Sequence, residues 1–102
     1  MIHVIATIRT VPGQRDALLG AFRDLIPAVH VETGCIEYGT AIDLATEISG
    51  LPPVRDDVVT VVEKWASVAA LRDHLAATHM LRHRERVKSM VAEVEIRVLE
   101  PR

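Results

Sequence analysis

Four short runs of the chain place β-branched or aliphatic residues at alternate positions, and this alternation constrains the fold more than any other feature. The runs are residues 2–9, 35–43, 57–65 and 94–98. A period of two predicts β-strands, because successive side chains of a strand point to opposite faces of a sheet. The third run carries valines at both odd and even positions, so we expect it to be apolar on both faces.

Two longer segments between these runs carry the apolar period of amphipathic helices. The first, residues 14–31, places its large apolar side chains three or four positions apart, on one helical face. These side chains are Leu18, Phe22, Leu25 and Val29. Pro27 lies inside this segment and predicts a kink, because proline lacks an amide proton and crowds the preceding turn. A second helix is expected to begin after Ser67, to break near residues 77–78 and to continue beyond the break.

The order strand, helix, strand, strand, helix, strand is typical of a ferredoxin-like βαββαβ fold, an α+β domain with one antiparallel sheet. A chain of 102 residues holds one core, so we assign residues 1–102 to a single domain. Two helices cover only one face of such a sheet, and we expect apolar residues on both. Those residues include Ile36, Tyr38, Val59 and Val61. The sheet of a second copy is the simplest cover, so we predict a homodimer.

Charge and hydropathy exclude several classes of function. Twelve Lys and Arg against fourteen Asp and Glu give a net charge of -2, which argues against a nucleic-acid partner. No uncharged apolar run is long enough to cross a bilayer, so we expect no membrane role. The single cysteine, Cys35, cannot form an internal disulfide, and the first residues lack the pattern of a signal peptide. We therefore expect a cytoplasmic protein.

Residues 44–56 interrupt this regular pattern. They contain the turn-forming pairs Ser49-Gly50 and Pro52-Pro53 and few periodic apolar positions. We predict a loop, which is long for a compact domain. Such a loop either covers a site or is a surface excursion, and the sequence leaves both possibilities open.

Histidines are the side chains best suited to chemistry here, because no nucleotide-binding, metalloprotease or serine-hydrolase motif is present. His79 and His83 stand four residues apart on one helical face, a spacing that suits a metal. No acidic residue lies between them, and a third ligand would have to come from His74 or a distant carboxylate, so we predict no metal site. His74 and His79 are candidates for a general acid or base, because histidine titrates near neutral pH. A purely structural role stays open for each.

Two segments resemble the antibiotic biosynthesis monooxygenase family. Residues 63–74, with His79 five positions further on, carry the main motif, and residues 34–38 are similar to the opening of the family's second strand. The resemblance extends from Ile2 to about Leu99. It implies a dimeric α+β barrel whose members oxygenate quinols or polycyclic hydroxyaromatics with O2, using no flavin, haem or metal.

Carried over position by position, this resemblance assigns the candidate site. Trp65, His74 and His79 match the motif and become the catalytic candidates, with the Trp65 ring as a flat wall for the substrate. We place four further side chains on the substrate: Tyr38, Glu63, Met80 and His83. Met80 stands where family members often carry an aromatic residue.

The leading hypothesis is a cofactor-independent monooxygenase that oxidises a small quinol or polycyclic hydroxyaromatic with O2. A non-catalytic small-ligand-binding or stress-associated dimer is the alternative, because Met80 replaces an aromatic residue and leaves fewer aromatic rings around a bound quinol. A third possibility is an isomerase or lyase that uses His74 or His79 only as a proton shuttle. Haem oxygenation ranks low, because haem-degrading relatives use an asparagine in the first strand, which this chain lacks.

Overall fold

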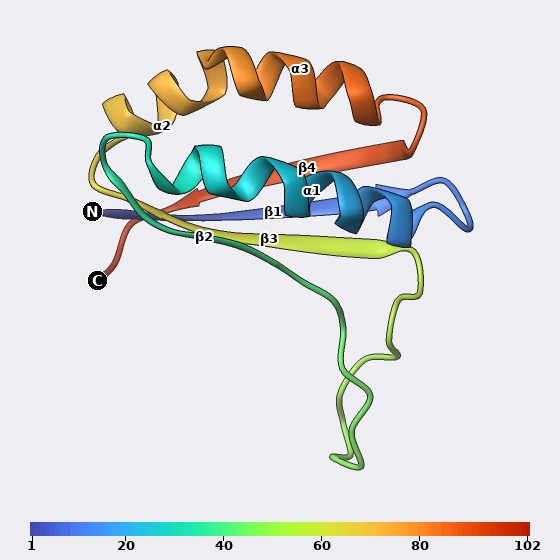
Figure 1. The fold of residues 1–102 in the computed structure, drawn as a ribbon. Coiled ribbons are helices and arrows are strands. Elements are labelled where there is room, and N and C mark those ends of the chain that lie inside the picture. Colours follow the sequence, from blue (N-terminus) through green and yellow to red (C-terminus); the bar gives the residue numbers. More distant parts are fainter.

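The computed structural model describes all residues from Met1 to Arg102 and contains four strands and three helices (Figure 1). In chain order they are β1 (Ile2–Thr10), α1 (Arg15–His30), β2 (Cys35–Ala41), β3 (Val58–Trp65), α2 (Val68–Ala76), α3 (Thr78–Val87) and β4 (Val91–Leu99). The ferredoxin-like order predicted from the periodicity is confirmed. The predicted break in the second helix is confirmed as well, because α2 ends at Ala76 and α3 begins at Thr78.

The four strands form one antiparallel sheet in the order β2-β3-β1-β4. All three helices lie on the same side of this sheet (Figure 1). The strand register aligns Tyr38 with Glu63, Glu63 with Val4 and Val4 with Val98, so these four side chains belong to one face. Because Val4 is buried in the core, that face is the one the helices cover.

The core is aliphatic and lies between the sheet and the helices. Every second residue of β1 and β3 is buried there, against the apolar stripe of α1. Leu18 and Val29 of that stripe are completely buried. Removing side chains of this size from water stabilises a fold by about 1.5–3 kcal/mol each, which explains why the period of the sequence predicts the elements so well. Pro27 is accommodated within α1, which continues to His30.

The predicted apolar character of β3 on both faces is confirmed, since Val58 and Val62 lie on the face opposite Val59 and Val61. Tyr38 lies on the helix-facing side with Val59 and Val61, because the register of β2 with β3 keeps them in phase. The irregularity of β2 lies between Cys35 and Glu37 rather than at Gly39, where we expected a bulge or a close approach. A Cβ added at Gly39 would meet no atom within 4 Å, so nothing approaches that position closely.

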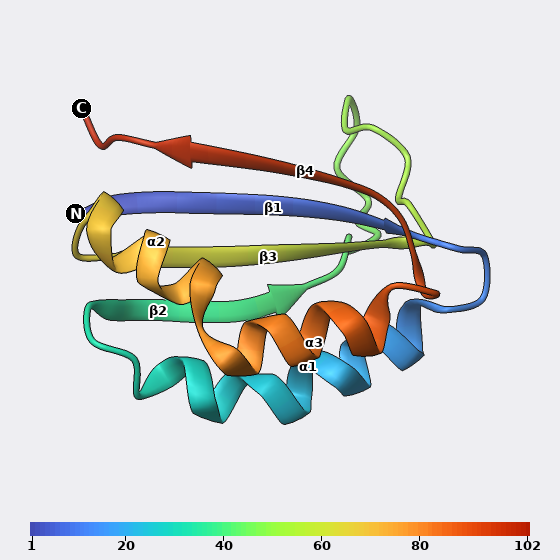
Figure 2. The same cartoon turned by 90° about the horizontal axis from the view of Figure 1, so that it is seen from above.

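Uncovered apolar side chains of the sheet lie mainly on β4, together with Ile36 on β2. Val94, Ile96 and Val98 point to the helix-facing side but remain about half exposed, at 50–52%. Figure 2 shows the reason, because α1 and α3 lie toward the β2 edge of the sheet and leave β4 uncovered at the opposite edge. This strand therefore offers apolar surface for a second copy to cover, and the homodimer remains a prediction.

Residues 42–57 form the long connection between β2 and β3, without helix or strand. Asp43 and Arg55 hold its base together through hydrogen bonds of 2.9 Å. The loop extends from the sheet on the side away from the helices (Figure 1). It therefore does not close over the space between sheet and helices. No helix in the structure has both the length and the apolar character needed to cross a membrane.

Candidate active site

A cavity of about 220 Å³ lies between the helix-facing side of the sheet and the three helices. Most of its lining is aliphatic, and five polar side chains are the exceptions: Tyr38, Glu63, His74, His83 and Arg84. The most exposed apolar residues of the lining are Leu75, Val94 and Ile96, so the cavity opens between α2 and β4. The structure thus brings His74 and all four predicted substrate-binding residues, Met80 included, to one cavity.

The break between α2 and α3 determines how the two candidate histidines are presented. Ser67 caps α2 by accepting a hydrogen bond from the Ala70 amide, and Ala77 ends it with an extended backbone (ψ 144°). In one continuous helix, side chains five positions apart would point about 140° away from each other. Because the chain turns at Ala77, His74 on α2 and His79 on α3 reach the same carboxylate.

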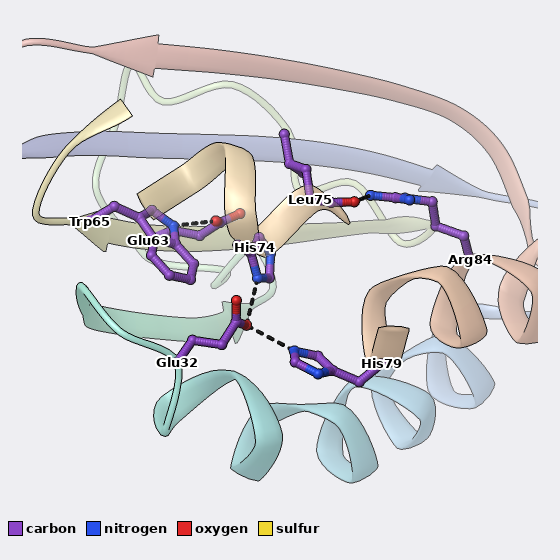
Figure 3. Close-up of polar contacts among 7 residues, drawn as sticks. All are labelled: Glu32, Glu63, Trp65, His74, Leu75, His79 and Arg84. Carbon is purple, nitrogen blue, oxygen red and sulfur yellow. Dashed lines mark hydrogen bonds and ion pairs between the residues drawn. The ribbon is translucent and has the colours of Figure 1, made fainter. Parts of the chain in front are cut away.

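That carboxylate is Glu32, in the turn that follows α1 (Figure 3). Its Oε2 atom lies 2.8 Å from Nδ1 of His74 and 2.9 Å from Nε2 of His79. Gly34 allows this approach, since it adopts a φ of +83° and a Cβ there would lie 2.7 Å from the Cβ of Ala70. The Ala66 amide also donates a 2.8 Å hydrogen bond to the Gly34 carbonyl, which fixes the turn beneath α2.

His74 is almost completely buried, with 1% of its surface exposed. Burial lowers the pKa of His74, because an imidazolium loses hydration there, and the Glu32 hydrogen bond and charge partly oppose this. A neutral His74 that donates its Nδ1 proton to Glu32 carries a lone pair on Nε2. The structure contains no fully buried side-chain nitrogen or oxygen atom that lacks a hydrogen-bond partner. Of the two ring nitrogens of His74, only Nδ1 has a partner, so Nε2 must retain some accessible surface. Since His74 lines the cavity, we infer that this acceptor nitrogen faces it.

Glu63 is a second titratable group at the cavity. Its Oε1 atom accepts a 2.8 Å hydrogen bond from Nε1 of Trp65. Burial and, to a lesser extent, the charge of Glu32 raise the pKa of Glu63 to about 7, although the bond from Trp65 acts in the opposite direction. Near neutral pH this carboxyl therefore exists in both forms, so it can donate or accept a hydrogen bond.

Trp65 does not have the place we expected. Its ring is fully buried, packs 4.6 Å from the His74 ring and does not line the cavity. The expectation that Trp65 forms a flat wall for the substrate is therefore wrong, because the ring lies behind His74. The aromatic ring beside His74 that does line the cavity is Tyr38, 5.3 Å away, and burial raises the pKa of its hydroxyl.

His83 shares the cavity but has different neighbours. Its ring packs 4.6 Å from that of Phe22. Burial, together with Arg86 and Arg84, lowers the pKa of His83 to about 4. Of the basic residues on α3, Arg86 pairs with Asp24 at 2.9 Å and Arg84 donates to the Leu75 carbonyl.

His79 also borders a second, more open hollow of about 180 Å³ between α1 and α3. We call it the α1–α3 groove; Asp24, Arg82 and Arg86 line it too. About 30% of the His79 side chain is exposed, against 2% for His74. His79 therefore contacts solvent in the α1–α3 groove, while its Nε2 atom contacts Glu32.

Glu32, His74 and His79 form the one cluster that offers three possible metal-ligand atoms, all within 4.8 Å of each other. The separations from Glu32 are ordinary hydrogen-bond lengths. No sequence pattern indicated Glu32, because it lies 42 and 47 positions from the two histidines. The only local signal was its place just before Thr33-Gly34, which predicted the end of the helix but no chemical role.

Comparisons with known proteins agree with this architecture. A family model described as "Antibiotic biosynthesis monooxygenase" matches residues 1–86. The chain is 41% identical over 103 residues to the "Probable quinol monooxygenase YgiN" of Escherichia coli K12, a match covering 99% of this chain and 98% of that relative.

Solved structures show the same fold. The crystal structure of PA3566 from Pseudomonas aeruginosa matches with a TM-score of 0.81 at 27% identity, covering 98% of this chain and 92% of that one. The structure of Rv0793 from Mycobacterium tuberculosis matches with a TM-score of 0.79 at 26% identity, covering 98% and 93%.

Proposed function

Because this chain belongs to the antibiotic biosynthesis monooxygenase family, we propose that it is a cofactor-independent monooxygenase that oxidises a small quinol or polycyclic hydroxyaromatic with O2. The observation that carries the proposal is the buried His74, whose Nδ1 atom contacts Glu32 while the residue lines an aliphatic cavity. A base held in this way suits removal of a proton from a weakly acidic hydroxyl.

The polar groups of the cavity suit a flat molecule with two oxygens. Nε2 of His74 accepts a hydrogen bond from one hydroxyl of the quinol. The carboxyl of Glu63, with its pKa of about 7, donates to or accepts from the second oxygen. Aliphatic side chains and Met80 contact the faces of the ring, and thioether sulfur makes favourable contacts with aromatic systems. The cavity therefore favours a small ring system over a long or strongly charged substrate.

Proton removal starts the reaction. His74 takes the hydroxyl proton at Nε2, and the resulting quinolate passes one electron to O2. Semiquinone and superoxide combine to form a C–O bond, and the peroxide oxygen takes a proton back. Loss of the ring C–H proton with cleavage of the O–O bond then releases water. One quinol and one O2 thus give one hydroxyquinone and one water, and the substrate supplies all the electrons.

Trp65 and Glu32 act through the other groups in this scheme. The Trp65 ring packs against His74 and its Nε1 atom holds Glu63, so it positions both titratable side chains. Glu32 keeps the His74 proton on Nδ1 and the lone pair on Nε2. We also propose that the protein is a cytoplasmic homodimer in which the half-exposed residues of β4 are covered by the second copy.

A non-catalytic ligand-binding protein is the second candidate. Met80 lines the cavity where the resemblance leads us to expect an aromatic residue, and the Trp65 ring lies outside. A cavity with these two properties binds a small ring but holds it less firmly during a reaction.

Oxygen consumption tests the proposal. The purified, chelator-treated protein is given naphthalenediols, anthrones and quinols with no added cofactor, and uptake is corrected for autoxidation. We expect protein-dependent uptake and a product that has gained one oxygen atom. Ligand binding without uptake would favour the binding protein, and conversion without oxygen would favour an isomerase or lyase.

A further inference from the structure

We propose that Glu32 and His79 form a proton relay that connects His74 in the cavity with solvent in the α1–α3 groove. This inference rests on the proposed function, because it concerns the proton that His74 removes from the substrate. It assigns roles in proton transfer to two side chains that do not line the cavity themselves.

The contacts form an unbroken chain from inside to outside. His74 lines the cavity, and its Nδ1 atom is 2.8 Å from Oε2 of Glu32. The same oxygen is 2.9 Å from Nε2 of His79, and His79 borders the α1–α3 groove (Figure 3). Both separations are hydrogen-bond lengths, so a proton crosses each without movement of the backbone. Because the two histidines share a single carboxylate oxygen, a proton that leaves one can reach the other.

The environment changes along this chain in the direction that a relay requires. His74 is buried beside Trp65 and Tyr38, where an imidazolium is poorly solvated. His79 has 30% of its side chain exposed, so a positive charge there is hydrated. Moving the proton outward therefore returns His74 to a neutral form, with its proton on Nε2. The reverse transfer restores the proton to Nδ1, and Nε2 is then an acceptor again.

Protons balance at every step of the path. His74 accepts the substrate proton at Nε2 and gives its Nδ1 proton to Oε2 of Glu32. In the resting contact, Nε2 of His79 donates to Oε2 of Glu32. Exchange with water moves the proton of His79 from Nε2 to Nδ1, and Glu32 then passes its proton from Oε2 to the free Nε2 atom. His79 exchanges the extra proton with water in the α1–α3 groove. The reverse path returns a proton for the peroxide, so the overall oxygenation releases no net proton.

Several charged or titratable groups face the relay and set its pH dependence. Toward Glu32 these are Cys35, Tyr38 and Glu63, whose pKa values are raised mainly by burial and further by the Glu32 charge. Toward His74 they are Glu32, His79 and Arg84. In the groove around His79 they are Asp24 on α1 and Arg82, His83 and Arg86 on α3.

Four variants separate a relay from a structural contact. His79→Gln keeps an N–H group that can donate to Glu32 but cannot accept and pass on a proton, and His79→Ala leaves space in the groove. Glu32→Gln blocks the middle of the path. Leu81→Ala, at an exposed position of α3, is the control for truncation of that helix. Circular dichroism and thermal melting establish that each variant is folded.

We expect both His79 variants to lower kcat for oxygen uptake about tenfold with little change in KM. This is less than the roughly 10²- to 10⁴-fold effect of a group that takes the substrate proton itself. Leu81→Ala keeps the wild-type rate. Imidazole, which enters the groove, restores kcat of His79→Ala but not of Glu32→Gln. The 1,3-dimethylimidazolium ion, the same ring without an exchangeable proton, restores neither.

Three outcomes would overturn the relay. The first is an unchanged kcat in folded His79→Ala and His79→Gln, and the second is equal rescue of Glu32→Gln by imidazole, since imidazole would then act in the cavity. The third is a wild-type rate that needs an added divalent metal ion after chelation, because the cluster would then be a metal site. The proposed function fails separately, by absence of oxygen uptake in the wild-type protein.

Discussion

The Glu32 side of the cavity (Glu32, His74 and His79) and its Phe22 side (Phe22 and His83) each contain a buried histidine, but the two histidines have different partners. His74 is 1% exposed and His83 is 7% exposed, so burial lowers the pKa of both. His74 contacts a carboxylate, whereas His83 packs on an aromatic ring and is affected by two arginines. Burial makes a histidine neutral, and its partner decides whether it can exchange protons.

The largest expected effect concerns the reaction itself. His74→Gln should lower kcat for oxygen uptake by about 10²- to 10⁴-fold, because an amide cannot take a proton. His83→Gln, the matched change on the Phe22 side, should act mainly through KM. Steady-state oxygen uptake of both variants measures the difference. Equal losses of kcat would mean that the contact with Glu32 does not distinguish the two histidines.

The next largest effect is the loss of folding stability at low pH that His83, on the Phe22 side, causes. His83 has a pKa of about 4 in the folded protein against an ordinary value of 6.5, so the unfolded chain binds its proton first as the pH falls. The neutral His83 therefore makes its whole contribution to the free energy of unfolding above pH 6.5. As the pH falls from 6.5 to 4, the free energy of unfolding drops by about 3 kcal/mol.

His83→Leu should remove this loss. Urea unfolding at pH 7 and pH 4.5 should show a smaller difference in the free energy of unfolding than in the wild type. The control is His3→Leu, on the other face of the sheet, which should keep the wild-type difference. A wild-type difference in His83→Leu would disprove the assignment to His83.

A substitution in the turn that carries Glu32 should have an intermediate effect on the free energy of unfolding. Gly34→Ala should lower the free energy of unfolding by about 2–3 kcal/mol, because a left-handed φ alone costs about 1–2 kcal/mol and the new Cβ also contacts Ala70. Gly13→Ala is the matched control, since Gly13 has a φ of +86° with no atom within 4 Å. Urea unfolding compares the two, and equal losses would show that the close contact with α2 is unimportant.

The smallest expected effect is on Glu63, whose pKa of about 7 lies above its ordinary value of 4.5. As the pH rises from 4.5 to 7, the unfolded chain ionises this group first, so its contribution falls over that range and stays low above it. Glu63→Gln should therefore raise the free energy of unfolding at pH 8 by about 1–2 kcal/mol, because a neutral bond to Trp65 replaces the ionic one. Unfolding at pH 8 and pH 4 tests this, with Glu85→Gln as the exposed control; a gain at both pH values would contradict it.

Local patterns predicted the elements because the burial that produces them repeats along the chain. Alternating residues of β1 and β3 fall on one face, and the three- and four-residue spacings of α1 give the buried stripe. The break near Ala77 was also readable, because Thr78 follows a short apolar period. The position of Trp65 behind His74 was not readable, since strand alternation says only that its ring points inward.

The sequence by itself determined the order of strands and helices, the ferredoxin-like fold and, through the family resemblance, the choice of His74 as a candidate site residue. Those features depend on neighbours within a few residues or on a motif that is continuous in the chain. Only the tertiary structure decided that Glu32 joins His74 to His79, that the long loop extends away from the helices and that Val94, Ile96 and Val98 of β4 stay half exposed. Each of these follows from packing between elements distant in sequence, which no local period records.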